Sequence, residues 1–310
     1  MQELILDEEQ LQKIADWMIV KKYSCSTWYN YTMYLKKIAK KNGKIDQEIA
    51  FAWLGKSKNP AQVAIISLIN NYCIDNSIDF FLKSVRIRQQ PRKIPEFMTF
   101  EEVKRLAESI PMPYSLMLKC LFNIGAGIRV SDLVKMRFEN FNWATWLENK
   151  EEQGLLILRK RKRGKDSPQN VPHKLMQELY NFATSAELVD EMGLPEQGLV
   201  FDFNAAEFKP DLREEDLALW TMKYIKHANN TLSYHIFKKY GINFLSTLGS
   251  RKIHLHTMRH SRATYLYNEE NKSIEELKEL RDDADISTTM IYTHIGKKKL
   301  FDKMKDVKSI

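Results

Sequence analysis

The segment HLHTMRHSRATYLY, in the C-terminal part of the chain, combines imidazole and guanidinium side chains at helical spacing. His256 and Arg259 stand three residues apart, so on a helix they share one face and converge on a common point. This pair suits a phosphoryl oxygen, because arginine offers a bidentate fork of donors and histidine exchanges a proton near neutral pH. A helix with scattered surface cations has the same spacing, so this segment alone leaves both interpretations open.

A second segment, GAGIRVSDL, places two glycines before Arg129 and places Asp132 within one helical turn after it. Glycines let the backbone turn tightly into a new helix, whose amide end favours an anion. Asp132 can then orient Arg129. An ordinary helix start with a surface ion pair remains the alternative.

A third segment is strongly cationic: six of the seven residues from Arg159 to Lys165 are Lys or Arg. It lies between a strand-like run at 155–158 and a second short segment at 169–172, so we expect it at the tip of a β-hairpin. Such a density of like charge is easier to explain beside a phosphate backbone than in isolation, although a solvated turn is the alternative.

A fourth segment, ISTTMIYTHIG, ends a short helical pattern at Tyr292. A single tyrosine is seldom a nucleophile, but here the four segments follow one another in a fixed order. In that order the chain resembles the tyrosine recombinases, the family of phage integrases and Xer proteins. GAGIRVSDL is similar to the first arginine box of that family, HTMRHSRATYL to its HxxR box and TTMIYTHIG to its nucleophile box. The resemblance covers roughly residues 122–295.

The resemblance implies a site-specific recombinase that cleaves and rejoins DNA. Tyr292 would attack a phosphodiester and leave a 3′-phosphotyrosyl link with a free 5′-hydroxyl. Arg129 and Arg259 would hold the non-bridging oxygens, and His256 would assist proton movement at the phosphate or at Tyr292. This chemistry requires neither a metal nor another cofactor.

In the family a hairpin lysine protonates the departing 5′-oxygen. Lys162 is the choice for this general acid and Lys165 is its close rival, while Arg161, Arg163 and Lys165 are expected to contact DNA. The chain departs from the family nine residues before the nucleophile, where Asp283 replaces the usual His or Trp. An anion beside a phosphate is unfavourable, so Asp283 either turns away to bond a backbone or side-chain donor, or leaves the site more dependent on His256.

The elements that must position these residues are mostly helical. Periodic apolar residues predict helices near 11–18, 31–38 and 63–73, at 114–125 and 131–136, and from 216 onward with breaks near 241, 249 and 268–273. Thr99 followed by Glu102 predicts a capping box. Residues 198–203 are expected to add another strand. The fold class is therefore mainly α with a small β-sheet, with an α+β tyrosine-recombinase catalytic domain.

The division into domains follows the prolines and charges of RIRQQPRKIP. We expect a helical core-binding domain, a DNA clamp, at 1–85, a linker at 86–95 and a catalytic domain at 96–310. A helix with one apolar stripe at 297–310 would form the C-terminal tail. In the family such a segment packs into a neighbouring subunit, so the resemblance implies a homo-tetramer in synapsis that exchanges this tail.

The chain has 310 residues, of which 44% are hydrophobic, and this excludes a disordered protein. Its net charge of +8 suits a polyanionic partner, here double-stranded DNA. Lys36, Lys37 and Lys40 are expected to face phosphates, with a solvated helix face as the alternative. No basic, apolar leader and no run of roughly 20 apolar residues is present. We therefore expect no membrane partner and a cytoplasmic, nucleoid-associated location.

Two alternatives to recombination remain at this stage. The first is a type IB topoisomerase-like enzyme that relaxes DNA with the same Arg, Lys, His and Tyr chemistry. The second is a catalytically weakened DNA-binding relative, which only Asp283 suggests.

Overall fold

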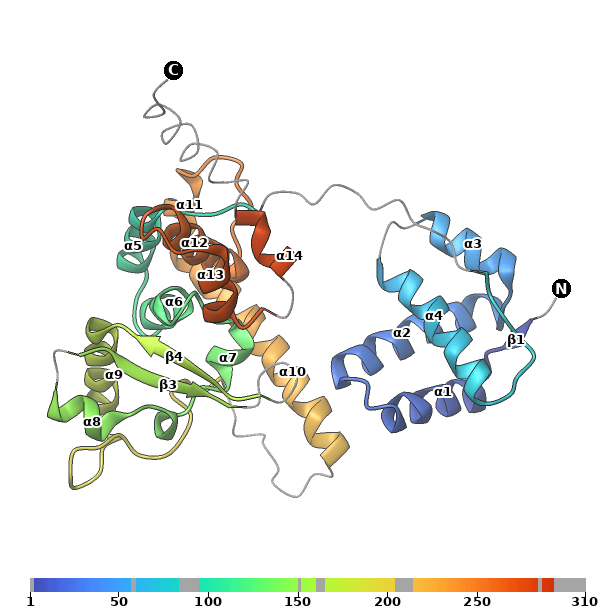
Figure 1. Ribbon diagram of the computed structural model, residues 1–310, viewed down its shortest axis with the longest axis horizontal. Helices are drawn as coiled ribbons and strands as arrows, with labels where there is room; N and C mark the ends of the chain where they lie inside the picture. The colour runs from blue at the N-terminus through green and yellow to red at the C-terminus, as the bar shows by residue number, and fades with distance from the viewer. Residues whose placement is uncertain are drawn as a thin grey trace, which may run out of the picture. The chain divides into compact units, whose positions relative to one another are not determined.

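The computed structural model describes residues 3–56, 60–83, 95–149, 152–159, 165–203, 214–283 and 286–292. The chain divides into two compact units, the first formed by residues 1–92 with 211–222 and the second by residues 93–210 with 223–310 (Figure 1). Both are mainly helical, as the sequence predicts, and each contains a two-stranded sheet; the sequence predicts the sheet of the second unit and not that of the first. Within the described residues, no helix is both long and apolar enough to cross a bilayer.

The first unit packs its helices around one apolar core. Its elements are β1 (Leu4–Ile5), α1 (Glu8–Val20), α2 (Cys25–Asn42), β2 (Lys44–Ile45), α3 (Gln47–Lys56) and α4 (Pro60–Asp75). The three predicted helices are confirmed as α1, α2 and α4, and their periodic apolar residues form the core. Gly43 ends α2 in the left-handed region at φ 67°, and this lets β2 turn back to pair antiparallel with β1.

The second unit contains the remaining elements. They are α5 (Phe100–Ser109), α6 (Tyr114–Asn123), α7 (Val130–Val134), η1 (Phe138–Asn140), α8 (Trp143–Glu148), β3 (Gly154–Leu158), β4 (Ser167–Val171), α9 (His173–Ser185), the second part of α10 (Glu214–Ser233), the π-helical η4 (Tyr234–Tyr240), α11 (Ile242–Ser246), α12 (Leu255–Asn268), α13 (Ile274–Arg281), α14 (Ile286–Thr289) and η5 (Met290–Tyr292). The predicted capping box opens α5, with Thr99 and Glu102 bonded to each other's backbone N–H. Residues 241, 249 and 269–273 lie outside α-helix, as expected, while Asn268 is still the last residue of α12.

The predicted hairpin is confirmed as β3 and β4, which pair antiparallel with Leu156 opposite Gln169. Alternate residues of both strands are buried, so one face covers the core. The strand expected at 198–203 is wrong. Leu199 forms only an isolated bridge to Arg137, because Arg137 lies at a helix end that offers no extended strand to pair with. Val200 and Phe201 are nevertheless buried as irregular chain.

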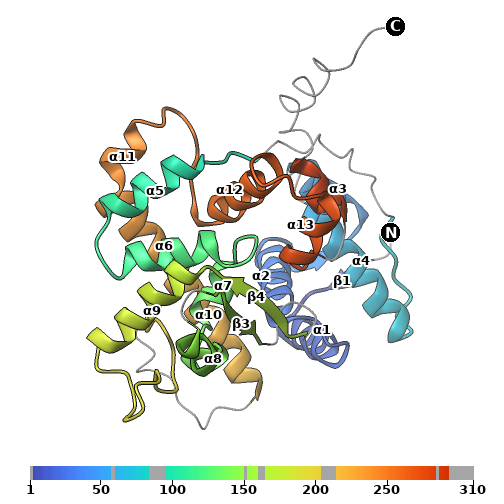
Figure 2. The same ribbon diagram turned by 60° about the vertical axis from the view of Figure 1, so that its left-hand side comes forward.

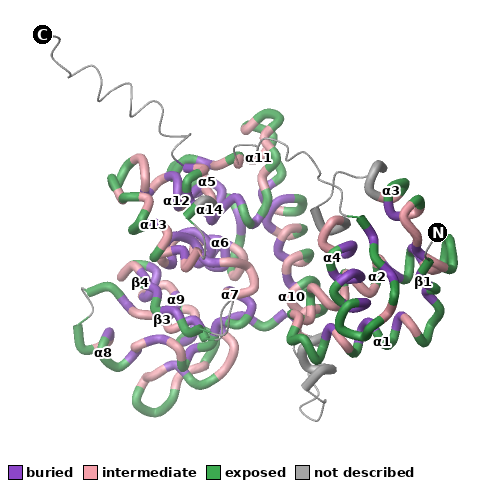
Figure 3. Tube along the Cα trace, turned by 45° about the vertical axis from the view of Figure 1, so that its right-hand side comes forward, coloured by how far each residue is buried: buried purple, intermediate pink, exposed green. Residues whose placement is uncertain are grey.

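Helices α6 and α12 form the centre of the second unit, and they pack directly against each other (Figure 2). Nearly all of α6 is buried, and the buried colour in Figure 3 runs along both helices. α12 also contacts α5, α13 and η5. A side chain on α12 is therefore held from several directions, which is the condition for a rigid site.

Candidate active site

The loop between α6 and α7 places Arg129 against α12. Gly125 and Gly127 have φ of 54° and 84°, in the left-handed region. A Cβ on Gly127 would lie 2.8 Å from the Cα of Arg259, so the absence of a side chain lets the loop reach the α12 backbone. Asp132 accepts a hydrogen bond from the Arg129 backbone N–H at 3.0 Å. Asp132 thus fixes the main chain of Arg129 at the start of α7.

Arg259 is 2% exposed and binds the backbone of two neighbouring segments. Its guanidinium donates to the carbonyl oxygen of Gly127 and, at 2.6 Å, to that of Arg281. Arg281 in turn donates to the carbonyl oxygen of Arg259 at 3.3 Å. These bonds lock α12 to the arginine loop and to the end of α13, and they hold the Arg259 side chain in place.

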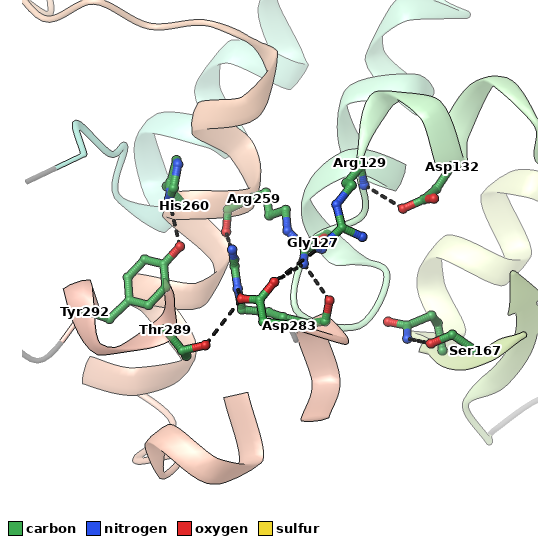
Figure 4. Close-up of polar contacts among 11 residues, drawn as sticks. Gly127, Arg129, Asp132, Ser167, Arg259, His260, Asp283, Thr289 and Tyr292 are labelled. Atoms are coloured by element: carbon green, nitrogen blue, oxygen red, sulfur yellow. Dashed lines mark hydrogen bonds and ion pairs between the residues drawn. The ribbon is translucent and has the colours of Figure 1, made fainter. Parts of the chain in front are cut away.

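Asp283 points into this cluster, as Figure 4 shows. One carboxylate oxygen lies 3.3 Å from a guanidinium nitrogen of Arg259 and 3.7 Å from one of Arg129. The other oxygen accepts hydrogen bonds from Nε of Arg281 at 2.7 Å and from the Thr289 hydroxyl at 3.3 Å. Burial favours the neutral acid, but the charges of Arg281, Arg259 and Arg129 outweigh it and hold the pKa of Asp283 below its usual value.

The sequence left two possibilities for Asp283, and the structure shows part of the first. Asp283 does bond side-chain donors, but it has not turned away, because two of those donors are the predicted phosphate-binding arginines. The two arginines therefore already hold an anion between them. Arg281, 5% exposed, supplies a third positive charge beside that anion.

Tyr292 ends η5 with no exposed surface. Its hydroxyl lies 2.7 Å from Nδ1 of His260, one residue after Arg259 on α12 (Figure 4). The Arg281 guanidinium lies 5.1 Å from the centre of the Tyr292 ring. Burial raises the pKa of Tyr292, and the nearby arginines only partly oppose it, so the hydroxyl keeps its proton at neutral pH.

His256 lies one helical turn before His260, and the two ring centres are 4.7 Å apart. The residue has substantial exposed surface, yet its imidazole sits among many protein atoms. This partial burial, followed by the charges of Arg259 and Arg281, lowers the pKa of His256 to about 4. A neutral His256 therefore lies beside the arginine cluster at physiological pH.

The structure brings together four of the five predicted catalytic residues, namely Arg129, His256, Arg259 and Tyr292. The fifth, Lys162, lies outside the described residues, as do Arg161 and Arg163. Lys165 is exposed just before β4. The hairpin itself is tied to the arginine loop, because the Gly125 N–H donates to the carbonyl oxygen of Asn170 at 2.9 Å.

The predicted DNA contacts of the first unit lie on α2. Lys36, Lys37 and Lys40 are all exposed there. Lys37 lies 5.6 Å from the Tyr34 ring centre. Exposure keeps both interpretations of these lysines open, since phosphate-binding and solvated side chains alike must reach the surface.

Sequence reasoning missed two residues of the site, Arg281 and His260. His260 carried a signal, since it lies four residues after His256 and so shares its helix face. Arg281 carried none, because its role depends on the path of the chain after α13. There Asp282, in the left-handed region at φ 52°, turns Asp283 back toward Arg259.

Comparison with known proteins identifies the family of the chain. The model of the phage integrase family matches residues 96–299, so the chain belongs to that family. Among curated relatives, tyrosine recombinase XerA of Pyrococcus furiosus is 25% identical over 97% of this chain and 94% of its own. Tyrosine recombinase XerA of Thermococcus kodakarensis is also 25% identical, over 93% of this chain and 91% of its own.

Solved structures show the same fold. XerH recombinase bound to palindromic difH substrate, in a post-cleavage complex, has a TM-score of 0.61 at 18% identity and covers 97% of this chain and 84% of its own. A lambda integrase dimer bound to a COC′ core site has a TM-score of 0.54 at 14% identity, covering 94% and 77%. The family and the fold together define a tyrosine-type site-specific recombinase.

Proposed function

We propose that this recombinase cleaves and rejoins DNA through Tyr292. The oxygen of Tyr292 attacks phosphorus, a 3′-phosphotyrosyl bond forms and the bond to the 5′-oxygen breaks. Arg129 and Arg259 bind the non-bridging oxygens as negative charge grows on them, and a hairpin lysine, Lys162 or Lys165, protonates the departing 5′-oxygen. His256 donates to the phosphate.

One observation supports this proposal more than any other. Arg129 and Arg259, which are far apart in the sequence, bind the same oxygen of the Asp283 carboxylate. Arg281 holds the other oxygen, and its guanidinium packs against the Tyr292 ring. A site that holds one anion between two guanidiniums next to a tyrosine has the donors that a phosphodiester needs.

The test is a covalent trap. We expect the full chain, mixed with a cognate site carrying a nick that lets the cleaved fragment diffuse away, to form a protein–DNA adduct without added divalent metal. Tyr292→Phe removes only a hydroxyl and should abolish the adduct while DNA binding in a gel shift persists. Tyr265→Phe is a matched control, because Tyr265 also lies in the second unit but outside the site. Persistence of the adduct in Tyr292→Phe would refute the assignment.

The partner that we propose is double-stranded DNA, which the relatives of known structure bind. The first unit, with Lys36, Lys37 and Lys40, would contact phosphates as a core-binding clamp at 1–85, joined by a linker at 86–95 to the catalytic domain at 96–310. Arg161, Arg163 and Lys165 would add contacts from the hairpin. We further propose a cytoplasmic, nucleoid-associated protein that assembles as a tetramer and exchanges a tail at 297–310, a segment outside the described residues.

The two alternatives receive less support. The relatives and the similar structures are recombinases and integrases, and no feature of the described residues favours DNA relaxation instead. Asp283, which alone suggested a weakened relative, is matched by the charge of Arg281.

A further inference from the structure

The hydrogen bond between Tyr292 and His260 joins the proposed nucleophile to a side chain that the HxxR spacing does not include. The Tyr292 oxygen lies 2.7 Å from Nδ1 of His260, within the range of a strong O–H···N bond. His256, to which the sequence assigned proton movement at either the phosphate or the tyrosine, packs against the His260 ring, with the ring centres 4.7 Å apart and the ring planes nearly perpendicular at 88°. Of the two histidines, His260 is thus the one in contact with the nucleophile.

The charge states of the pair leave a proton on Tyr292 and a free lone pair on the His260 ring. Burial, then the neighbouring His256 and Arg281, lowers the pKa of His260 to about 3, so the imidazole is neutral at pH 7. Tyr292 keeps its proton, because burial raises the pKa of its hydroxyl. In the tautomer that carries its ring proton on Nε2, the hydroxyl donates and Nδ1 accepts. A lone pair aimed at the proton of the nucleophile is the arrangement that general-base catalysis requires.

We propose that His260 is the base that removes the proton of Tyr292 during strand cleavage, an inference that rests on the proposed function. As the tyrosine oxygen forms its bond to phosphorus, its proton passes to Nδ1 of His260 and the ring becomes an imidazolium. The bond from phosphorus to the 5′-oxygen breaks, and the hairpin lysine supplies the proton to that oxygen. In the rejoining step, the imidazolium returns its proton to the tyrosine oxygen as the phosphotyrosyl bond breaks.

The surroundings of His260 explain how a weak resting base can act in the reaction. In the free protein, burial disfavours a positive imidazole at His260, and the charges of neighbouring groups, among them Arg281 and Arg259, add to this effect. A phosphodiester at the arginines places negative charge next to Tyr292, and that charge grows in the transition state. That charge offsets the part of the pKa shift that comes from Arg281 and Arg259, so the basicity of His260 rises when the tyrosine must lose its proton. His256, with exposed surface, remains available for the phosphate.

A second interpretation of the same bond is a lock that keeps Tyr292 in its buried position. The two interpretations predict opposite effects of removing the imidazole. If His260 only locks the tyrosine, His260→Ala frees the nucleophile and cleavage proceeds at the wild-type rate or faster. If His260 is the base, cleavage slows, because the hydroxyl must ionise without help.

The experiment is single-turnover adduct formation on the nicked site, with wild type, His260→Ala, His260→Gln and, as a matched control, His256→Ala. We expect His260→Ala and His260→Gln to be slower by about a hundredfold or more at pH 7, the usual contribution of a positioned base. The rate of His260→Ala should rise steadily with pH up to about 9, as more tyrosine ionises. Imidazole in solution should restore part of the rate of His260→Ala and should not restore that of His256→Ala.

The outcomes separate this inference from the proposed function. A wild-type or faster rate in His260→Ala overturns the base and leaves the lock. A slow His260→Ala that responds to neither pH nor imidazole also overturns it, because a purely structural defect has that signature. Equal DNA binding and thermal unfolding of the variants establish that they are folded. An adduct in Tyr292→Phe would instead refute the proposed nucleophile, whatever the histidine variants do.

Discussion

Arg281 and Asp283 should behave as one unit in catalysis, and this can be tested by removing their charges separately and together. Their side chains are 5% and 8% exposed and lie 2.7 Å apart. With Arg129 and Arg259, the site holds three positive charges and one negative charge. The net charge of these four side chains is +2, which balances the two negative charges of a pentacoordinate phosphorane.

The size of the effect follows from Coulomb's law. Arg281→Met leaves Asp283 without its nearest counter-charge, and for an assumed separation of roughly 6 Å its carboxylate would repel an incoming phosphate. At an effective dielectric constant of about 20, this repulsion is worth about 3 kcal/mol, or about a hundredfold in cleavage rate. Adding Asp283→Asn removes the repulsion, so the double variant should recover to within about tenfold of the wild type.

The assay is the rate of covalent adduct formation on the nicked site under single-turnover conditions. Arg251→Met is the structural control, since Arg251 forms a partly buried pair with Glu102 that includes no site residue. It should lower thermal stability and leave the cleavage rate nearly unchanged. The charge-balance argument is wrong if the double variant cleaves as slowly as Arg281→Met. It is also wrong if the fold decrease in the rate of the double variant equals the product of the decreases in Arg281→Met and Asp283→Asn.

Three further predictions concern the loop, the first unit and the hairpin. Gly127→Ala should lower the free energy of unfolding by about 2 kcal/mol or more and slow cleavage, because the new Cβ would lie 2.8 Å from the Cα of Arg259. Gly43→Ala, whose Cβ would have no atom within 4 Å, should lower the free energy of unfolding in denaturant by only about 1 kcal/mol. Neutralising Lys36, Lys37 and Lys40 of α2 together should weaken binding to every DNA sequence. It should also reduce the slope of log affinity against log salt by about 2 to 3, and an unchanged slope would show that these lysines are solvated. A substrate with sulfur in place of the 5′-bridging oxygen needs no general acid, so it should rescue cleavage by Lys162→Ala, and rescue of Lys165→Ala alone would transfer that role.

The sequence predicted the parts of the site that depend on local spacing. The capping box at Thr99, the β3–β4 hairpin and the helix that carries His256 and Arg259 all follow from patterns within a few residues, and the structure contains each of them. The contact of Arg129 and Arg259 with one anion could be expected only from the resemblance, since 130 residues separate them.

The remaining features depend on where distant segments meet. Asp283 reaches Arg259 because Asp282 adopts a left-handed conformation, which glycine favours and which no spacing rule assigns to aspartate. The segment 198–203 has the apolar pattern of a strand, but a strand also needs a partner, and only Arg137 provides one bridge. Burial of Val200 and Phe201 required an apolar pattern there whether or not a strand formed.

The complete burial of Tyr292 has a consequence for fidelity. A hydroxyl with no exposed surface cannot attack a phosphodiester that diffuses past, so cleavage requires a rearranged conformation in which the oxygen is accessible and, on the proposal above, still bonded to His260. If that conformation lies about 3 kcal/mol above the resting one, it is populated less than one per cent of the time, and the cleavage rate on DNA that binds both conformations equally falls by the same factor. A DNA site that binds the rearranged conformation more tightly recovers this factor, and other DNA does not. The closed tyrosine thus converts differences in binding energy between DNA sequences into differences in the rate of strand breakage.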